Sequence, residues 1–263
     1  MAIIIAVMNH KGGVGKTTVA VNLGHALTRR NQRVLVVDCD PQANSSDLLL
    51  QGEPSGDSLY ELYEASDEYD ASNCIYPTDY ERLCCLPNIE ETSGLEPTMI
   101  TGDTQANLSI LRDRLRQPVQ DRFDVVLIDC PPNMGFFVIS SLYAANFVIV
   151  PVISGSRASI KGLSNAIKLI GGIQQSGNPD LRFLRLLINA VDRRTIMGRV
   201  GIDQIRTHFA ADQIFETMIP TNAVFQRAEH EQKTIIRYDP AAAGSRAYRL
   251  LAQEVADICS LKV

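Results

Sequence analysis

The chain has 263 residues, of which 45% are apolar and 21% are charged, and its formal net charge is −5. This composition suffices for a large buried core, and no apolar run approaches the roughly 20 residues that span a bilayer, which excludes a transmembrane helix. The first residues lack a signal-peptide pattern, so we expect a cytoplasmic protein. The six cysteines show no C-x-x-C spacing, which argues against zinc, and we expect reduced thiols.

Strands and helices are predicted to alternate along the chain. Short apolar, β-branched runs predict strands at 2–8, 33–38, 82–87, 124–129, 147–152, 183–190 and 214–219. Helices are expected at 16–30, 105–117, 136–145, 158–173, 197–209, 223–231 and 242–259. Strands such as FVIVPV are apolar on both faces, as a parallel sheet covered by helices on both sides requires. The pattern predicts a doubly wound, mostly parallel α/β fold, in one domain over 1–263.

The first predicted strand leads into the glycine-rich stretch HKGGVGKTT, His10 to Thr18. A strand, such a loop and a helix form a phosphate cradle, because glycines let backbone N–H groups approach an anion and the helix N-terminus adds partial positive charge. Lys16 should reach the β- and γ-phosphates, and the Thr17 hydroxyl should ligate Mg²⁺. The nucleotide-binding residues expected here are Lys11, Gly12, Gly13, Val14, Gly15, Lys16, Thr17 and Thr18.

One residue of this loop departs from the usual pattern. The spacing G-x-x-x-x-G-K-[ST] calls for a glycine where Lys11 stands, so the loop opens with a second lysine. A lysine at that position needs a reason beyond the phosphate cradle itself, because Lys16 already supplies the lysine of the pattern.

Three aspartates follow two further strands. VLVVDCDPQANSS delivers Asp38 and Asp40, and FDVVLIDCPP delivers Asp129, to the carboxyl edge of the sheet, where open α/β sheets bind ligands. Asp129 is placed to hold Mg²⁺, usually through water. Thr17, Asp40 and Asp129 are therefore the expected metal-site residues. Cys39 and Cys130 follow these aspartates and should pack as small apolar residues.

Charge is distributed unevenly along the chain. Residues 1–150 contain 10 Lys and Arg against 20 Asp and Glu, whereas residues 151–263 contain 15 against 10. The acidic residues are concentrated between Glu53 and Glu96, where ELYEASDEYD is expected to form an exposed helix or loop. We interpret 51–81 as an acidic insertion at the rim of the domain, and a solvated face is its simplest explanation.

Together, KGGVGKTT, VDCDPQAN and IDCPP resemble the deviant Walker ATPases of the ParA/MinD family, and the similarity continues through IPTNAVFQRAEHEQKTIIRYDP to YRLLAQEV. The likeness is greatest to ParA-type, Soj-like partition ATPases. It implies ATP and Mg²⁺ as cofactors and an ATP-dependent sandwich homodimer. Lys11 occupies the signature-lysine position, which reaches the phosphates of the other subunit as an arginine finger does. Asp40 would position the attacking water, so Lys11, Lys16 and Asp40 are the expected catalytic residues.

The same resemblance implies contacts to adenine and to DNA. Asn189, Pro220 and Asn222 are the expected adenine-side residues. Family members that move on DNA bind it without sequence preference, through Lys and Arg that neutralise phosphates. The expected DNA-binding residues are Arg193, Arg194, Arg199 and Arg227, with Arg206, Arg237, Arg246 and Arg249 as further candidates. Relatives often carry arginine where Thr221 and Val224 stand, and ordinary solubilising arginines remain the alternative.

The function implied is plasmid or chromosome partitioning by a nucleoid-associated ATPase that a ParB-like centromere-binding partner stimulates. The alternatives are a ParA-like ATPase that positions a protein cargo, such as a microcompartment or chemoreceptor cluster, and a MinD-like membrane-associated regulator. Against a membrane partner, the last helix carries Ala247, Leu250, Leu251, Val255 and Ile258 at core spacing and is followed only by CSLKV. Cys130 lacks a second cysteine in a context suited to an iron–sulfur cluster.

Overall fold

A mostly parallel sheet forms the centre of the computed structural model, which describes residues 2–52, 54–65, 69–101, 103–154, 157–192 and 194–261. Its strands are β1 (Ile3–Val7), β2 (Val34–Asp38), β3 (Tyr76–Pro77), β4 (Leu83–Leu86), β5 (Val125–Asp129), β6 (Phe147–Ile153) and β7 (Arg182–Asn189). Their order is β3-β4-β2-β5-β1-β6-β7, and only β3 runs antiparallel to its neighbour. The predicted doubly wound α/β fold is confirmed.

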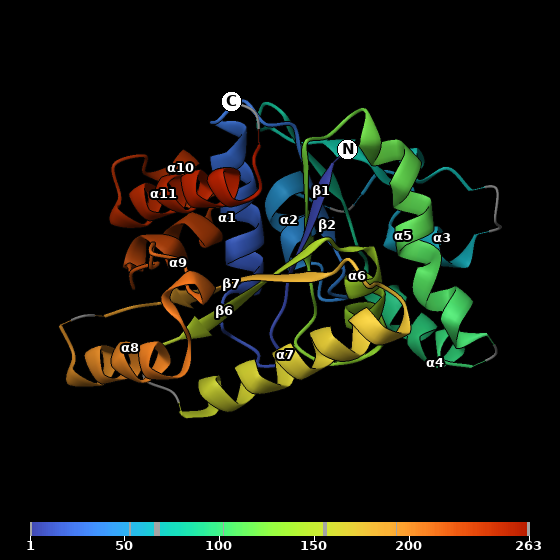
Figure 1. The fold of residues 1–263 in the computed structure, drawn as a ribbon. Helices are drawn as coiled ribbons and strands as arrows, with labels where there is room; N and C mark the ends of the chain where they lie inside the picture. The colour runs from blue at the N-terminus through green and yellow to red at the C-terminus, as the bar shows by residue number, and fades with distance from the viewer. Residues whose placement is uncertain are drawn as a thin grey trace.

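Helices cover both faces of this sheet. They are α1 (Lys16–Thr28), α2 (Asn44–Leu50), α3 (Leu59–Glu64), α4 (Glu96–Met99), α5 (Thr104–Gln120), α6 (Phe136–Ala144), α7 (Arg157–Ser176), α8 (Ile196–His208), α9 (Ala223–His230), α10 (Ile235–Tyr238) and α11 (Ala243–Ile258). Short 3₁₀ helices span Ala71–Cys74, Glu90–Leu95 and Ala211–Gln213. Figure 1 shows α1 and α11 on one side of the sheet and α5 on the other. No helix among the described residues combines the length and apolar character needed to cross a membrane.

Two apolar layers hold the helices to the sheet. On one face, Leu23 of α1 and Leu251 of α11 pack against the sheet, and neither is exposed. On the other face, Leu111 of α5 and Leu142 of α6 are equally buried. Full burial of one such side chain contributes roughly 1.5–3 kcal/mol. Because every residue of β2 and β5 is buried, these strands need apolar side chains on both faces, as the sequence has.

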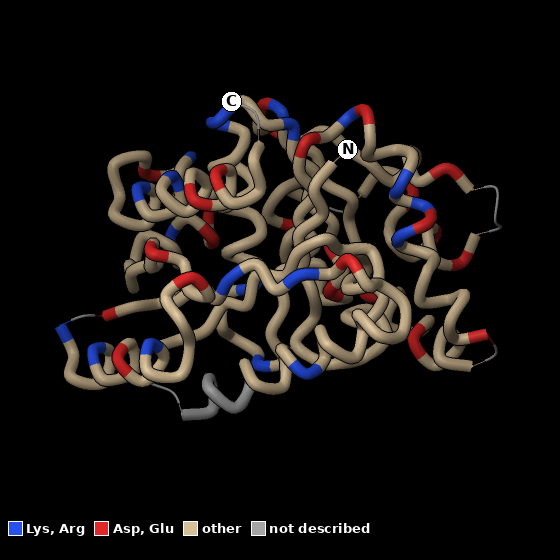
Figure 2. Tube along the Cα trace, viewed as in Figure 1, with Lys and Arg blue, Asp and Glu red and all other residues tan. Residues whose placement is uncertain are grey.

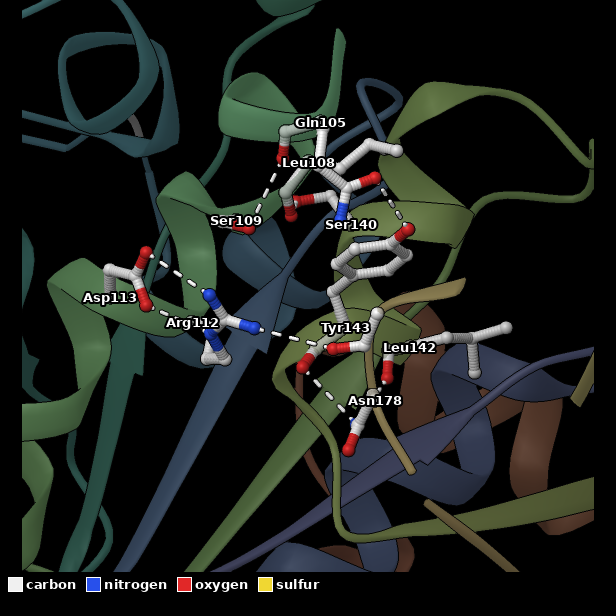
Figure 3. Close-up of polar contacts among 10 residues, drawn as sticks. Gln105, Leu108, Ser109, Arg112, Asp113, Ser140, Leu142, Tyr143 and Asn178 are labelled. Carbon is white, nitrogen blue, oxygen red and sulfur yellow. Dashed lines mark hydrogen bonds and ion pairs between the residues drawn. The ribbon is translucent and has the colours of Figure 1, made fainter. Parts of the chain in front are cut away.

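A polar cluster fastens the carboxyl end of α7 to α6 (Figure 3). The Asn178 carboxamide donates to the backbone oxygens of Leu142 and Tyr143 at 2.8 and 3.1 Å. It also donates to the Ala145 oxygen at 2.7 Å. These are carbonyls at the end of α6, which lack partners within their own helix. Across the same cluster, Ser140 Oγ donates to the Leu108 oxygen of α5 at 3.0 Å. These bonds join α5, α6 and the turn that follows α7.

The predicted strand at 214–219 is wrong. This segment lies beside β7 with only isolated bridges, between Leu186 and Ile214 and between Val191 and Pro220. The backbone N–H groups of Glu216 and Thr217 turn away from the sheet, and they donate to the carboxylate of Glu254 in α11 at 2.9 and 2.7 Å. Capture of these two donors by a side chain interrupts the ladder that the apolar sequence favours.

The acidic region around 51–81 also differs from expectation. ELYEASDEYD was expected to be exposed, but α3 buries Leu62 and Tyr63, and Tyr63 Oη donates to Ser140 Oγ at 2.8 Å. Residues 66–68 of this stretch lie outside the described residues. In α11, Leu250 was expected in the core but is 61% exposed, while Ala247, Leu251 and Val255 are buried. Apolar spacing alone did not identify the face of the helix on which Leu250 lies.

Candidate active site

The glycine-rich loop connects β1 to α1 at the carboxyl edge of the sheet. Gly13 and Gly15 have φ values of +70° and +87°, in the left-handed region that glycine tolerates best. At Gly15 a Cβ would also lie 2.3 Å from Asn189 Nδ2, so the Asn189 side chain would have to move and give up its hydrogen bond to the Val14 oxygen. Gly15 immediately precedes α1, so its backbone directs the helix N-terminus toward the loop. The loop thus has the form of an anion cradle.

Two asparagines hold the cradle in place. Asn9 Nδ2 donates to the Pro151 oxygen of β6 at 2.8 Å, and Asn9 Oδ1 accepts from the Lys11 N–H at 3.0 Å. Asn189, at the end of β7, donates to the Val14 oxygen at 2.7 Å. The sequence reasoning missed Asn9, although an asparagine between a buried strand and a glycine loop is a residue that often bonds to local backbone.

The two lysines of the loop have different surroundings. The Lys16 side chain enters the site, is 7% exposed, and donates from Nζ to the Lys11 oxygen at 3.4 Å. Burial lowers the pKa of Lys16, and the charges of Asp129, Cys130 and Asp40 oppose that effect. Lys11 is half-buried and does not line the cavity described below. Lys16 therefore belongs to the site, and Lys11 stands at its edge.

The three predicted carboxylates come together at the ends of β2 and β5. Asp38 and Asp129 are register partners on these neighbouring strands, and both are fully buried. Asp38 accepts from the Ser46 N–H and Oγ at 2.9 and 2.7 Å and from the Asp40 N–H at 3.1 Å. Asp40 accepts from the Gln42 N–H at 3.0 Å. The predicted convergence of these aspartates is present in the structure.

Asp129 has the properties of a metal ligand. Its Oδ2 accepts a hydrogen bond from Ser45 Oγ, and the Thr17 hydroxyl also bonds to this carboxylate. Its Oδ1 is buried and has no hydrogen-bond partner among the described residues. Burial raises the pKa values of Asp129 and Asp38. A carboxylate oxygen beside a threonine hydroxyl fits Mg²⁺, which takes oxygen ligands and often retains water.

A cavity of about 530 Å³ joins these parts. Its phosphate-side lining includes Gly12, Gly13, Gly15, Lys16, Thr17, Thr18 and Asp40. Its other wall comes from α9 and the turn after it, with Phe225, Ala228, Glu229, Gln232 and Lys233. A volume of this size is typical of cofactor pockets. The site thus extends from the phosphate cradle along α1 to α9.

The predicted adenine-side residues lie outside this lining. Asn189 supports the loop from behind, and Asn222 begins α9 by accepting from the Val224 N–H at 2.9 Å. Pro220 lines a separate hollow that also contains Thr217 and Leu250. Their contact with adenine stays a prediction. Phe225, Ala228 and Gln232, which line the cavity, were missed, although Phe225 and Ala228 are three residues apart, the spacing of one helix face.

The predicted DNA-binding arginines are spread over several elements. Arg199 and Arg206 of α8 and Arg227 of α9 are exposed, and Figure 2 shows that these helices lie at the opposite end of the sheet from α3. The Arg194 side chain is 88% exposed and forms two hydrogen bonds with Asp192, at 2.9 and 3.0 Å. Arg193 lies outside the described residues. The structure alone therefore does not unite these arginines in one patch.

Known proteins share both the sequence and the fold of this chain. A family model described as an AAA domain matches residues 2–183. The sporulation initiation inhibitor protein Soj of Bacillus subtilis is 34% identical over 257 residues, with 97% of this chain and 99% of that protein covered. The chromosome partitioning protein ParA of Myxococcus xanthus is 32% identical over 253 residues, with 96% and 87% covered.

A solved structure supports the same assignment. Cobyrinic acid a,c-diamide synthase from Mycobacterium smegmatis, with bound ATP analogue and magnesium, superposes with a TM-score of 0.83 at 29% identity, covering 99% of this chain and 97% of that one. The glycine loop with its extra lysine, the paired strand-end aspartates and the near full-length similarity to Soj and ParA lead to one assignment. The chain belongs to the ParA/MinD family of P-loop ATPases.

Proposed function

We propose that the protein binds ATP with Mg²⁺ and hydrolyses it to ADP and phosphate. The observation that carries this proposal is the convergence of Lys16, Thr17 and Asp40 on one cavity, with Asp129 behind them. Lys16 would neutralise phosphate charge, and Thr17 with Asp129 would hold the metal ion, which supplies further neutralisation when bound. Asp40 would orient the attacking water, and the support for this role is that Asp40 lines the cavity together with the phosphate loop.

We further propose that ATP joins two subunits face to face. Lys11 sits at the opening of the loop and does not line the cavity of its own subunit. A cation at that position can stabilise phosphate charge in trans only when a second nucleotide-loaded subunit approaches. The dimer would therefore form with ATP and separate after hydrolysis.

The ATP-bound dimer is proposed to bind DNA without sequence preference and to act in plasmid or chromosome partitioning with a ParB-like partner. The excess of basic residues in 151–263 supports this part, as do the names of the relatives, which include chromosome partitioning proteins. Two basic faces on one duplex bind much more tightly than one, since phosphate contacts add in the logarithm of affinity. Such a protein would be found on the nucleoid in the cytoplasm.

The experiment that tests the proposal measures three properties of one preparation. We expect Mg²⁺-dependent phosphate release, a dimer on size-exclusion chromatography with ATP but not ADP, and binding to random duplex DNA only with ATP. Lys16→Ala should lose at least about 100-fold in ATP affinity, while Lys168→Ala on the exposed face of α7 should match the wild type. Equal DNA affinity with ADP and ATP, or a sequence-specific footprint, would contradict the switch.

A further inference from the structure

The turn between α9 and α10, residues 231–234, belongs to the wall of the 530 Å³ cavity that α9 supplies. Gln232 and Lys233 of this turn line the cavity. The Lys233 N–H donates to the Ala228 oxygen of α9 at 2.8 Å, so the turn stays against the end of that helix. Thr234 is the N-cap of α10, which lies beside α1 and contacts it (Figure 1). The turn therefore connects the cavity wall to the helix that follows the glycine loop.

Lys233 gives this wall a positive charge. Within the described residues, Lys16 and Lys233 are the only Lys or Arg side chains that line the cavity. Lys233 Nζ forms an ion pair with Glu231 Oε2 at 2.8 Å, and the two side chains are 42% and 48% exposed. A pair as exposed as this one contributes little to stability, so a bound anion can replace the carboxylate as the partner of Nζ. The cavity thus has a cation on each of two walls.

The hydroxyl of Thr234 fixes the state of a histidine on α1. Thr234 is fully buried, and its Oγ1 accepts from the Arg237 N–H at 3.2 Å and lies 2.6 Å from His25 Nδ1. Because a backbone N–H can only donate, the buried hydroxyl hydrogen needs His25 Nδ1 as its acceptor. Burial, together with the charges of Arg29 and Arg237, lowers the pKa of His25 to about 4. The imidazole is therefore neutral at neutral pH, and Nδ1 keeps the lone pair that Thr234 requires.

Two further hydrogen bonds attach the same turn to its surroundings. Asn22 of α1 accepts with Oδ1 from the Ile235 N–H at 2.8 Å. The Thr234 N–H donates to Tyr80 Oη at 3.1 Å, and both of these residues are buried. The turn is thus held to α1 by two side chains of that helix and to the segment before β4 by a third. The helix that begins at the glycine loop therefore also sets the position of Lys233.

We propose that Lys233 is a nucleotide-binding residue that pairs with the terminal phosphate of ATP, and that His25 is the positioning residue that holds it in place through Thr234. This inference rests on the proposed binding of ATP. Lys233 Nζ would leave the Glu231 carboxylate for the γ-phosphate oxygens, which carry more negative charge and accept stronger hydrogen bonds. ADP lacks this phosphate and would leave Lys233 paired with Glu231. ATP would thereby link the glycine loop to the turn after α9.

The test is calorimetric titration of the full chain with a non-hydrolysable ATP analogue and with ADP, each with Mg²⁺. We expect Lys233→Met to weaken binding of the analogue about tenfold and binding of ADP less than about twofold. Glu231→Gln removes the competing carboxylate and should tighten analogue binding about threefold. Lys168→Met, at an exposed position on α7, is the matched control and should equal the wild type for both nucleotides. Unchanged analogue affinity in Lys233→Met, or an equal loss for the analogue and ADP, would overturn the assignment.

The role of His25 is tested by removing its acceptor and by restoring it. His25→Leu should weaken analogue binding about fivefold and leave ADP binding unchanged, whereas His25→Asn, whose Oδ1 can accept in place of Nδ1, should recover most of the loss. His25→Leu/Lys233→Met should bind no more weakly than Lys233→Met alone, because both changes remove the same contact. Thr234→Ala removes the hydroxyl from the other side and gives the same test if His25→Leu does not fold. Additive losses, or no recovery in His25→Asn, would overturn the positioning role.

The wild-type titrations separate this inference from the proposed function. Wild-type protein that bound neither nucleotide and released no phosphate from ATP would overturn both. Wild-type protein that bound and hydrolysed ATP, with Lys233→Met matching its analogue affinity, would overturn only the role of Lys233. Selective loss of the analogue in Lys233→Met, with recovery in His25→Asn, would support both parts of the inference.

Discussion

The candidate nucleotide site and the basic end, by which we mean helices α8 and α9 with Arg199, Arg206 and Arg227, use charged residues in opposite ways. Around the glycine loop, Lys16, Asp38, Asp40 and Asp129 are buried, and the aspartates are bonded to backbone or to hydroxyls of neighbouring strands and helices. In the basic end, Arg199 and Arg206 are exposed on the surface of α8. Charges in the first region would act through fixed geometry in low dielectric. In the proposed DNA complex, charges in the second region would act through the number of phosphate contacts they make.

This difference determines how much one substitution can do. Removing one member of a buried, bonded group leaves its partners unsatisfied and disables the site, so effects should be large and specific. Removing one exposed arginine from several removes one phosphate contact and leaves the others in place. Substitutions in the two regions should therefore differ by orders of magnitude in effect.

The largest effect is expected for Asp40→Ala. Removing this carboxylate takes away the group proposed to orient water but leaves the phosphate cradle intact, so ATP turnover should fall about 1,000-fold while ATP binding persists. The variant should accumulate as an ATP-bound dimer on size-exclusion chromatography. Asp212→Ala, at an exposed position on the 3₁₀ helix after α8, is the matched control. A monomer with ATP and Mg²⁺ would count against the role given to Asp40.

Lys11→Ala should reduce ATP turnover nearly as much as Asp40→Ala does, but it should also prevent dimerisation while leaving ATP binding intact. Because Lys11 does not line its own cavity, the variant should bind ATP within about threefold of wild type as a monomer. It should neither dimerise nor hydrolyse ATP, since the cation supplied to the other subunit is missing. Fluorescent-nucleotide titration and sedimentation on the same sample separate the two properties. A normal ATP dimer would remove the basis for a lysine acting in trans.

Sequence motifs identified the residues that the structure brings together at the glycine loop, for a physical reason. The glycines, Lys16, Thr17 and the strand-end aspartates lie within short stretches whose backbone geometry is set by adjacent residues, as Gly15 shows. Asn9 and Asn189 hold the loop across distances of over 140 residues along the chain, to Pro151 and Val14, and such contacts leave no local pattern. The wall formed by Phe225 and Gln232 likewise depends on how α9 packs against α10, which in turn contacts α1.

The errors in the fold have the same origin. The apolar run at 214–219 has the composition of a strand, but Glu254 on α11 captures two of its N–H groups. The acidic composition around α3 suggested a solvated face, yet Tyr63 packs edge-on against Phe136 and Phe137 with ring centroids 5.7 and 5.4 Å apart. In both cases contacts with an element distant in sequence determine the local structure, and these contacts cannot be predicted from the composition of the segment itself.

Asp129→Asn should change the free energy of unfolding of the nucleotide-free protein, by an amount that depends on pH. Burial raises the pKa of Asp129 to about 6, so the folded protein holds a proton that the unfolded chain releases near pH 4. This contribution to stability is complete below about pH 4 and is lost as the pH rises through 6. The nucleotide-free variant should thus be more stable than wild type at pH 8, by about 2 kcal/mol or about 5 °C in Tm, and the gain should shrink at pH 5.

Calorimetry in EDTA at both pH values checks this prediction. Asp212→Asn, which removes an exposed carboxylate, should leave the melting temperature unchanged at either pH. A gain that is equal at pH 5 and pH 8 would show that the buried charge is not its cause. Mg²⁺ with ATP should reverse the order of stability, since the wild-type carboxylate then gains its proposed partner.

The smallest effects are expected from single arginines on the basic end. Arg199→Ala should weaken binding of the trapped Asp40→Ala dimer to random duplex DNA about two- to fivefold, and should flatten the slope of log affinity against log salt by about two, because each subunit loses one phosphate contact. Arg194→Ala should do less, because Arg194 is already paired with Asp192 at 2.9 Å. Arg116→Ala, on an exposed face of α5, is the control. If Arg116→Ala weakened DNA binding as much as Arg199→Ala does, the basic end would not be the DNA-binding surface. The effect of either substitution would then follow from the change in net charge of the protein.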